Sequence, residues 1–102
     1  MIRVLFASAS LLVGCGASTV IDGKQYKTAC AAPTDCAAVF FGDQCGVCAC
    51  PNAAISASDK VLYEADRTAA RTQCGPQPAI ACGPCQESVL TCTNGACGLQ
   101  AK

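Results

Sequence analysis

The chain contains no histidine and no tryptophan among its 102 residues. The absence of histidine removes the side chain most often used as a general base near neutral pH, and the commonest metal ligand. The sequence also lacks a Gly-x-Ser-x-Gly turn, a phosphate-binding glycine loop and a calcium-binding loop. It therefore predicts a protein that is not an enzyme, with no catalytic residues, no bound metal and no cofactor.

Charge is sparse and balanced, with seven Lys and Arg against seven Asp and Glu. Because there is no basic patch, we expect no nucleic-acid partner. Asp35 and Asp43 stand beside turn residues and are predicted to bond to nearby backbone N–H groups. Asp59, Glu64 and Asp66 are predicted to lie on the solvated face of a helix.

Large apolar side chains are scarce, which predicts a thin hydrophobic core. Beyond residue 15 the aromatic residues are only Tyr26, Phe40, Phe41 and Tyr63. Consecutive residues of a strand point to opposite faces. We therefore expect one of the two phenylalanines in the core, with the other packed under the helix or exposed as a contact.

Cysteine supplies what the core lacks, since eleven are present in this short chain. Such density in an exported chain is typical of a disulfide scaffold. Each bridge contributes about 2–4 kcal/mol, mainly by constraining the unfolded chain. The spacing leaves the pairing open. The ten cysteines expected in disulfides are Cys30, Cys36, Cys45, Cys48, Cys50, Cys74, Cys82, Cys85, Cys92 and Cys97.

Two Cys-x-x-Cys motifs, Cys45–Cys48 and Cys82–Cys85, allow two other readings. Two such pairs of thiolates have the spacing of a tetrahedral zinc site. The second pair encloses Gly-Pro and so resembles the active-site dipeptide of thioredoxin, over four residues only. No strand–helix–strand pattern surrounds it. We favour disulfides and keep thiol–disulfide exchange as a third functional option, behind the two given below.

The N-terminus has the composition of an export signal. A positive charge at Arg3 precedes an apolar stretch of about ten residues, which is too short to span a bilayer. The stretch ends in Leu12-Val13-Gly14-Cys15, and polar sequence follows. An ordinary signal peptide, cut a few residues later, is the alternative interpretation.

These residues resemble the lipobox of bacterial lipoproteins. The resemblance implies cleavage before Cys15, a diacylglycerol on its sulfur and an acyl chain such as palmitate on the new amine. Several chains on one residue give stable anchoring where a single chain is marginal, so the membrane is the expected partner. Gly16 follows the cysteine instead of the Asp that retains such proteins at the inner membrane, which favours the outer membrane. The expected organisation is a signal peptide over 1–14, a lipidated tether over 15–29 and a Cys-rich domain over 30–100.

One helix is predicted over residues 58–73, with Ser58 as its N-cap and Gly75-Pro76 as its stop. Its inner face is predicted from the apolar residues that recur at helical spacing. Its charged residues, Lys60, Glu64, Arg67 and Arg71, fall elsewhere on the helix. The predicted inner face consists of Val61, Leu62, Ala65, Ala69 and Thr72.

The remaining pattern predicts short strands. Residues 37–41 form a buried strand, and Asn94-Gly95 joins strands over 88–93 and 96–99, because this dipeptide is a strong hairpin signal. Asp22-Gly23 allows another small hairpin over 20–26. The predicted fold is a small disulfide-rich α+β domain, in which one helix packs on an antiparallel sheet of about three strands.

The region from 30 to 99 resembles small Cys-rich lipoproteins of uncharacterised role, through its cysteine layout, Thr34-Asp35-Cys36 and the Cys-x-Asn-Gly-x-Cys run from Cys92 to Cys97. We therefore predict a non-enzymatic, membrane-anchored extracytoplasmic module for binding or envelope structure. The alternative is a disulfide-held protease inhibitor that presents Pro78-Ala79-Ile80, because preorganised loops bind proteases well.

Overall fold

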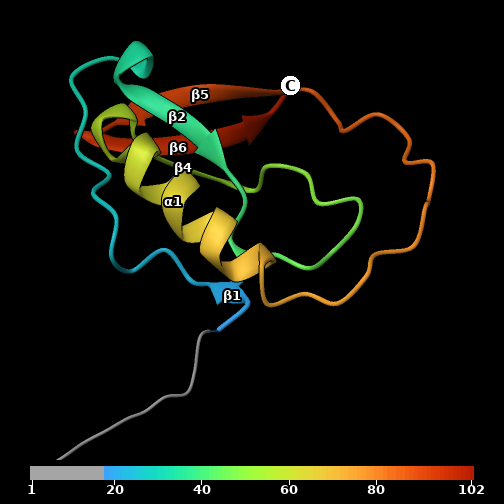
Figure 1. Ribbon diagram of the computed structural model, residues 1–102. Coiled ribbons are helices and arrows are strands. Elements are labelled where there is room, and N and C mark those ends of the chain that lie inside the picture. Colours follow the sequence, from blue (N-terminus) through green and yellow to red (C-terminus); the bar gives the residue numbers. More distant parts are fainter. Residues whose placement is uncertain (1–17) are drawn as a thin grey trace, which may run out of the picture.

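The computed structural model describes residues 18–102, which fold into one α-helix and six short strands (Figure 1). The strands form three separate two-stranded antiparallel sheets. The disulfide-rich α+β class is confirmed, but the strands do not join into one sheet of about three. The pairs are β1 (Val20–Ile21) with β3 (Gly42–Asp43), β2 (Cys36–Val39) with β4 (Ala53–Ser56), and β5 (Ser88–Thr93) with β6 (Ala96–Ala101).

Two features of the backbone keep the sheets apart. The strand predicted over 37–41 ends at Val39, because the next two residues bond to side chains and not to a neighbouring strand. Between β4 and β6 runs the connecting segment 27–30, which bonds to both. Lys27 O accepts the N–H of Ser56 at 2.8 Å, and Thr28 O accepts the N–H of Cys97 at 2.7 Å. The segment is too short to complete a continuous sheet.

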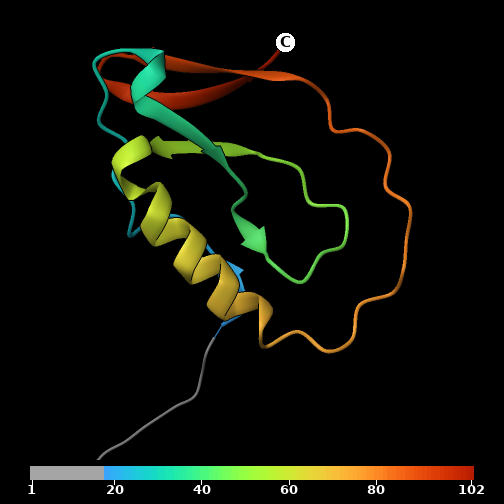
Figure 2. The same cartoon turned by 45° about the horizontal axis from the view of Figure 1, so that its top comes forward.

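The β5–β6 hairpin lies against the β2–β4 pair, and α1 lies on the opposite side of that pair (Figure 2). The predicted turn is confirmed, with positive φ at Asn94 (54°) and Gly95 (76°) as a two-residue hairpin loop requires. Strand β6 runs to Ala101, two residues beyond the prediction.

Helix α1 spans Lys60–Arg71 and follows a 3₁₀ turn over Ala57–Asp59, so its predicted location is confirmed with shorter bounds. The predicted inner face is wrong. Val61 is 81% exposed and Leu62 is 47% exposed, whereas Tyr63 and Ala70 are buried. An Ala-rich stripe has little area to bury, and the Tyr63 ring brings far more apolar surface into the interior.

The core is small and partly aromatic. It consists of Ile21, Tyr26, Val39, Ile55 and Tyr63, with Phe41 and Ala53 packed against it. The Tyr26 ring is stacked on Phe41 at a centroid distance of 6.0 Å and meets Tyr63 edge-on at 5.8 Å. Two of the five core residues, Tyr26 and Tyr63, thus make aromatic contacts, which are worth more than the buried area of the rings alone.

Residues 18–29 belong to the folded domain, which corrects the tether expected up to residue 29. Ile21 and Tyr26 are buried and supply two of the five residues of the core cluster. The expected hairpin over 20–26 is also wrong, because β1 pairs with β3 instead. Asp22 and Gly23 do form a turn, in which Gly23 has a φ of 85° and Asp22 Oδ1 accepts the Lys24 N–H.

The acidic residues divide between turns and long-range contacts. Asp35 and Asp43 accept backbone N–H groups of nearby residues, as predicted. The solvated face expected for the helical acids is wrong for two of them. Asp59 Oδ2 accepts the Lys27 N–H at 2.7 Å, and the Tyr26 hydroxyl donates to Asp66 Oδ2 at 2.6 Å. Both carboxylates therefore fasten the N-terminal segment to the region of α1.

Burial and the hydrogen bond to Asp66 raise the pKa of Tyr26 above its ordinary value of 10.0. The folded state thus favours the neutral phenol, while the unfolded chain loses the proton at its ordinary pKa. This contribution to stability is complete below pH 10 and declines as the pH rises above it.

We predict that the free energy of unfolding falls more steeply above pH 10 in the native chain than in Tyr26→Phe. The variant lacks the ionisable hydroxyl but keeps the ring. Denaturant unfolding at a series of pH values measures the difference, with the slopes between pH 7 and pH 9 as the internal control. Equal slopes for the two proteins above pH 10 would contradict the assignment.

Candidate functional site

All ten cysteines among residues 18–102 are paired, in five disulfides. None of these bridges joins neighbours in the sequence, since their separations run from 29 to 62 residues. The pairs are Cys30–Cys92, Cys36–Cys97, Cys45–Cys74, Cys48–Cys82 and Cys50–Cys85. The sequence left this pattern open, and the fold decides it.

Two bridges fix the C-terminal hairpin to the rest of the domain. Cys92 and Cys97 are directly opposite each other on β5 and β6. Each nevertheless bonds to a cysteine outside the hairpin, Cys30 or Cys36. The sulfur atoms of Cys30, Cys36 and Cys97 consequently lie within 4.8 Å of one another. Zinc binds thiolates, whereas these sulfurs are already oxidised, so the cluster is a pair of adjacent disulfides.

The other three bridges join two irregular segments to each other and to the end of α1. Residues 75–87 contain no helix or strand, and all of them are exposed. Cys82 and Cys85 bond to Cys48 and Cys50, so neither Cys-x-x-Cys motif closes on itself. A dithiol exchange site needs its two sulfurs to form one reversible bridge. The pairing gives no support to thiol–disulfide exchange.

Disulfides at this density indicate an oxidising environment outside the cytoplasm. Within residues 18–102, no helix combines the length and the apolar character needed to cross a membrane. Cys15, the predicted lipidation site, and Gly16 lie outside the described residues. Lipidation of Cys15 and the sorting role of Gly16 stay predictions from the sequence.

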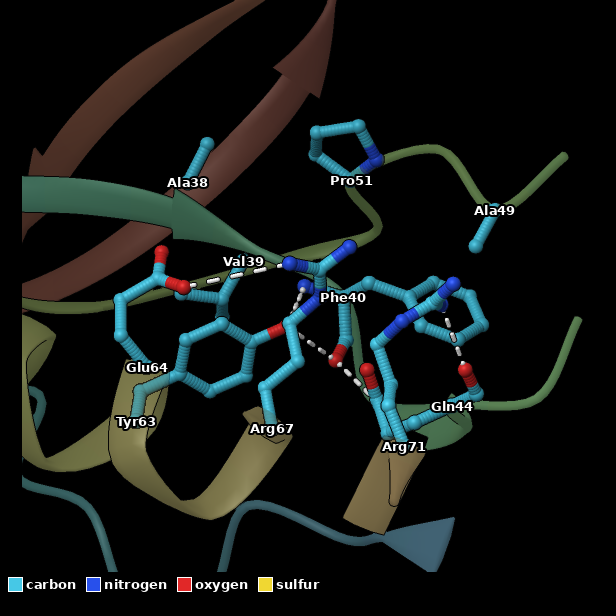
Figure 3. Close-up of a pocket in the computed structure, with 10 residues that line it drawn as sticks. All are labelled: Ala38, Val39, Phe40, Gln44, Ala49, Pro51, Tyr63, Glu64, Arg67 and Arg71. Carbon is cyan, nitrogen blue, oxygen red and sulfur yellow. Dashed lines mark hydrogen bonds and ion pairs between the residues drawn. The ribbon is translucent and has the colours of Figure 1, made fainter. Parts of the chain in front are cut away.

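A cavity of about 170 Å³ lies between α1, the end of β2 and the segment 44–51, which we call the 44–51 loop (Figure 3). One part of its lining is apolar and the other is charged. The apolar residues are Ala38, Val39, Phe40, Ala49 and Pro51, and the polar ones are Gln44, Tyr63, Glu64, Arg67 and Arg71.

Hydrogen bonds to the backbone around Phe40 hold the floor of this cavity. The Tyr63 hydroxyl donates to Phe40 O at 2.9 Å and accepts the Phe40 N–H at 3.0 Å. Gln44, only 2% exposed, donates through Nε2 to the carbonyls of Phe40 (3.0 Å) and Gly42 (3.1 Å). Asn52 bonds to both backbone groups of Phe41. The turn that follows β2 is therefore fixed by side chains from three different segments.

The charged wall comes from one face of α1. Arg71 donates through Nη1 to the carbonyl of Gln44 at 2.9 Å, which ties the helix to the 44–51 loop. Glu64 lies 3.7 Å from Lys60 and 4.0 Å from Arg67, and all three side chains are nearly half exposed. Such exposed ion pairs are worth little and exchange easily. The helical spacing predicts that these residues lie away from the inner face of the helix. It does not predict that the 44–51 loop lies opposite them.

Both phenylalanines are half-buried, with different neighbours. Phe41 packs on the core through Tyr26, while Phe40 lines the cavity. One phenylalanine is thus at the core, as expected, and the other contributes to a candidate binding surface.

Comparison with family models, with curated proteins and with solved structures finds no match for this chain. Two features of the described residues bear on function, the disulfide framework and the cavity beside α1.

We predict that removing the Cys36–Cys97 bridge costs more stability than removing Cys50–Cys85. Their separations of 61 and 35 residues give loop-closure contributions that differ by less than about 1 kcal/mol. Cys36 is also buried, at 6% exposure, whereas Cys50 lies in an irregular loop. Double Cys→Ala variants compared by denaturant unfolding measure the two losses. A greater loss for Cys50→Ala/Cys85→Ala would contradict this ranking.

Proposed function

We propose that this protein is a non-enzymatic, lipid-anchored binding module of the cell envelope. The observation that carries the proposal is the use of cysteine. Ten of the eleven are paired within the folded domain. The remaining one, Cys15, ends a sequence that resembles a lipobox. This division supports a lipid-bearing role for one cysteine and a structural, disulfide-forming role for the other ten.

Anchoring places the domain close to the membrane surface. Only four residues separate Cys15 from Val20, the first residue of β1. Five Cα–Cα steps span at most about 19 Å. The domain would therefore work beside the lipid headgroups, and Gly16 favours the outer membrane as its site.

A binding role fits the domain better than catalysis does. The chain has no histidine, and the cavity beside α1 offers charged and apolar contacts without a nucleophile–base pair. Hydrogen bonds hold its floor at Phe40 and the Arg71 side chain in place before any ligand arrives. Preorganised sites lose little conformational entropy on binding, which favours recognition.

We predict that Cys15→Ala abolishes incorporation of labelled palmitate, because the variant lacks the sulfur that the lipid-transferring step modifies. Metabolic labelling followed by mass spectrometry of the N-terminus measures the effect in intact cells. Ser18→Ala, which is close by but outside the motif, is the matched control and keeps the label. Native protein that carries no label, or begins well after Cys15, would overturn the anchor.

A second candidate is an inhibitor-like loop, favoured by one observation. Ile80 is 54% exposed in the irregular segment 75–87, which disulfides at Cys82 and Cys85 hold in place. Protease inhibitors present an apolar or basic side chain from a rigid loop in a similar way.

If the binding-module proposal is right, a panel of serine and cysteine proteases keeps its activity in the presence of the purified chain. Residual activity at increasing inhibitor concentration is the measurement. The Ile80→Lys variant serves as the comparison. Stoichiometric inhibition that shifts from apolar-specific to lysine-specific proteases in this variant would establish the inhibitor instead.

A further inference from the structure

The face of α1 beside the cavity carries an excess of positive charge. Lys60, Arg67 and Arg71 outnumber the single carboxylate of Glu64 on this face, in a chain whose formal net charge is zero. Two of these cations, both arginines, line the cavity. The local potential at the cavity is therefore positive, and it favours an anionic ligand.

The two guanidinium groups retain donors for such a ligand. Figure 3 shows both arginine side chains leaving the same side of α1 and extending toward the 44–51 loop. Arg71 uses Nη1 for the carbonyl of Gln44. A guanidinium has five N–H donors, so most remain available. The bond to Gln44 also orients Arg71, which lowers the entropy lost when it binds an anion.

The rest of the lining selects among anions. The apolar walls of the cavity come from Val39, Phe40 and Pro51. They offer no hydrogen bonds to replace the water that an inorganic ion would lose on entering. Its volume of about 170 Å³ is below the roughly 300–1,000 Å³ of sites for drug-sized ligands. The dimensions fit a carboxylate with a short apolar substituent.

We propose that this cavity binds a small carboxylate whose apolar substituent packs on Phe40 and Pro51, while Arg67 and Arg71 hold its oxygens. The chain end of a peptide and a free organic acid share this chemistry. The inference deepens the binding role proposed above and rests on it. It does not depend on lipidation at Cys15.

Glu64 gives the proposal a test of opposite sign. Its carboxylate lies 4.0 Å from Arg67 and so competes with an incoming carboxylate for that guanidinium. Neutralising the glutamate should strengthen binding, and neutralising either arginine should weaken it. A purely structural role for this cluster would not give opposite changes in ligand affinity.

The experiment uses the full chain in non-ionic detergent micelles, titrated with N-acetylalanine and followed by NMR shifts of the arginine side chains. N-acetylalanine amide, which has the same shape without the charge, is the control ligand. N-acetylalanylalanine and propionate are the two further probes, and they distinguish a peptide end from a free acid. We expect saturable shifts with the carboxylates and none with the amide.

We expect Arg71→Gln and Arg67→Gln each to weaken N-acetylalanine binding about tenfold or more, because each removes a charged hydrogen-bond donor. Arg71→Lys keeps the charge but loses the planar fork, and should also weaken binding. Glu64→Gln should strengthen it. Lys24→Gln, which removes an exposed positive charge that does not line the cavity, should leave it unchanged.

Equal binding of the amide, equal binding of inorganic phosphate, or no saturable shift with any carboxylate would each overturn the inference. Thermal unfolding of every variant identifies a loss of binding that comes from misfolding. If Arg71→Gln is misfolded, the affinity of Arg67→Gln tests the proposal, because that substitution removes no hydrogen bond to the backbone within residues 18–102. Palmitate labelling of the same samples reports on the anchor separately. A labelled protein that binds no carboxylate would refute the ligand class and leave the anchored module in place.

Discussion

Covalent cross-linking holds together segments that share too little apolar surface to hold one another. The core cluster consists of Ile21, Tyr26, Val39, Ile55 and Tyr63, and no residue of the β5–β6 hairpin is buried. Residues 75–87 are exposed throughout. A domain of this size buries a modest fraction of its surface. Disulfides restrict the unfolded chain and thereby supply the stability that such a core lacks.

Side-chain hydrogen bonds take the place of strand pairing at the candidate site. Its floor is irregular backbone after β2, where a continuous strand would have paired with a neighbour. The side chains of Tyr63 and Gln44 satisfy that backbone instead, and Arg71 bonds to the carbonyl of Gln44 in the 44–51 loop. The bridge between Cys45 and Cys74 fixes the loop to the helix end. A domain with a small core thus acquires a cavity whose floor is fixed, and a preformed floor lowers the entropic cost of binding.

Local patterns predicted the elements whose causes are local. The helix lies within the predicted range, although it ends at Arg71, before Gly75-Pro76. The β5–β6 turn follows from Asn94-Gly95, which tolerates positive φ. Asp35 and Asp43 bond to backbone within a few residues, as their positions suggested. The predicted inner face of α1 is wrong because the prediction uses the spacing of aliphatic residues and leaves out Tyr63. The buried face of α1 contains Tyr63, whose ring contacts Tyr26 and whose hydroxyl bonds to the backbone of Phe40.

The sequence by itself determined the amount of cysteine, the balance of charge, the positions of the helix and the C-terminal turn, and the lipobox-like N-terminus that predicts an anchor. These depend on composition or on residues a few positions apart. Only the tertiary structure decided which sulfurs pair, that Tyr26 belongs to the core, and that Arg67 and Arg71 line a cavity with Phe40. Each of these outcomes joins residues that are distant in the sequence. Their proximity is set by packing and chain closure, which local preferences do not determine.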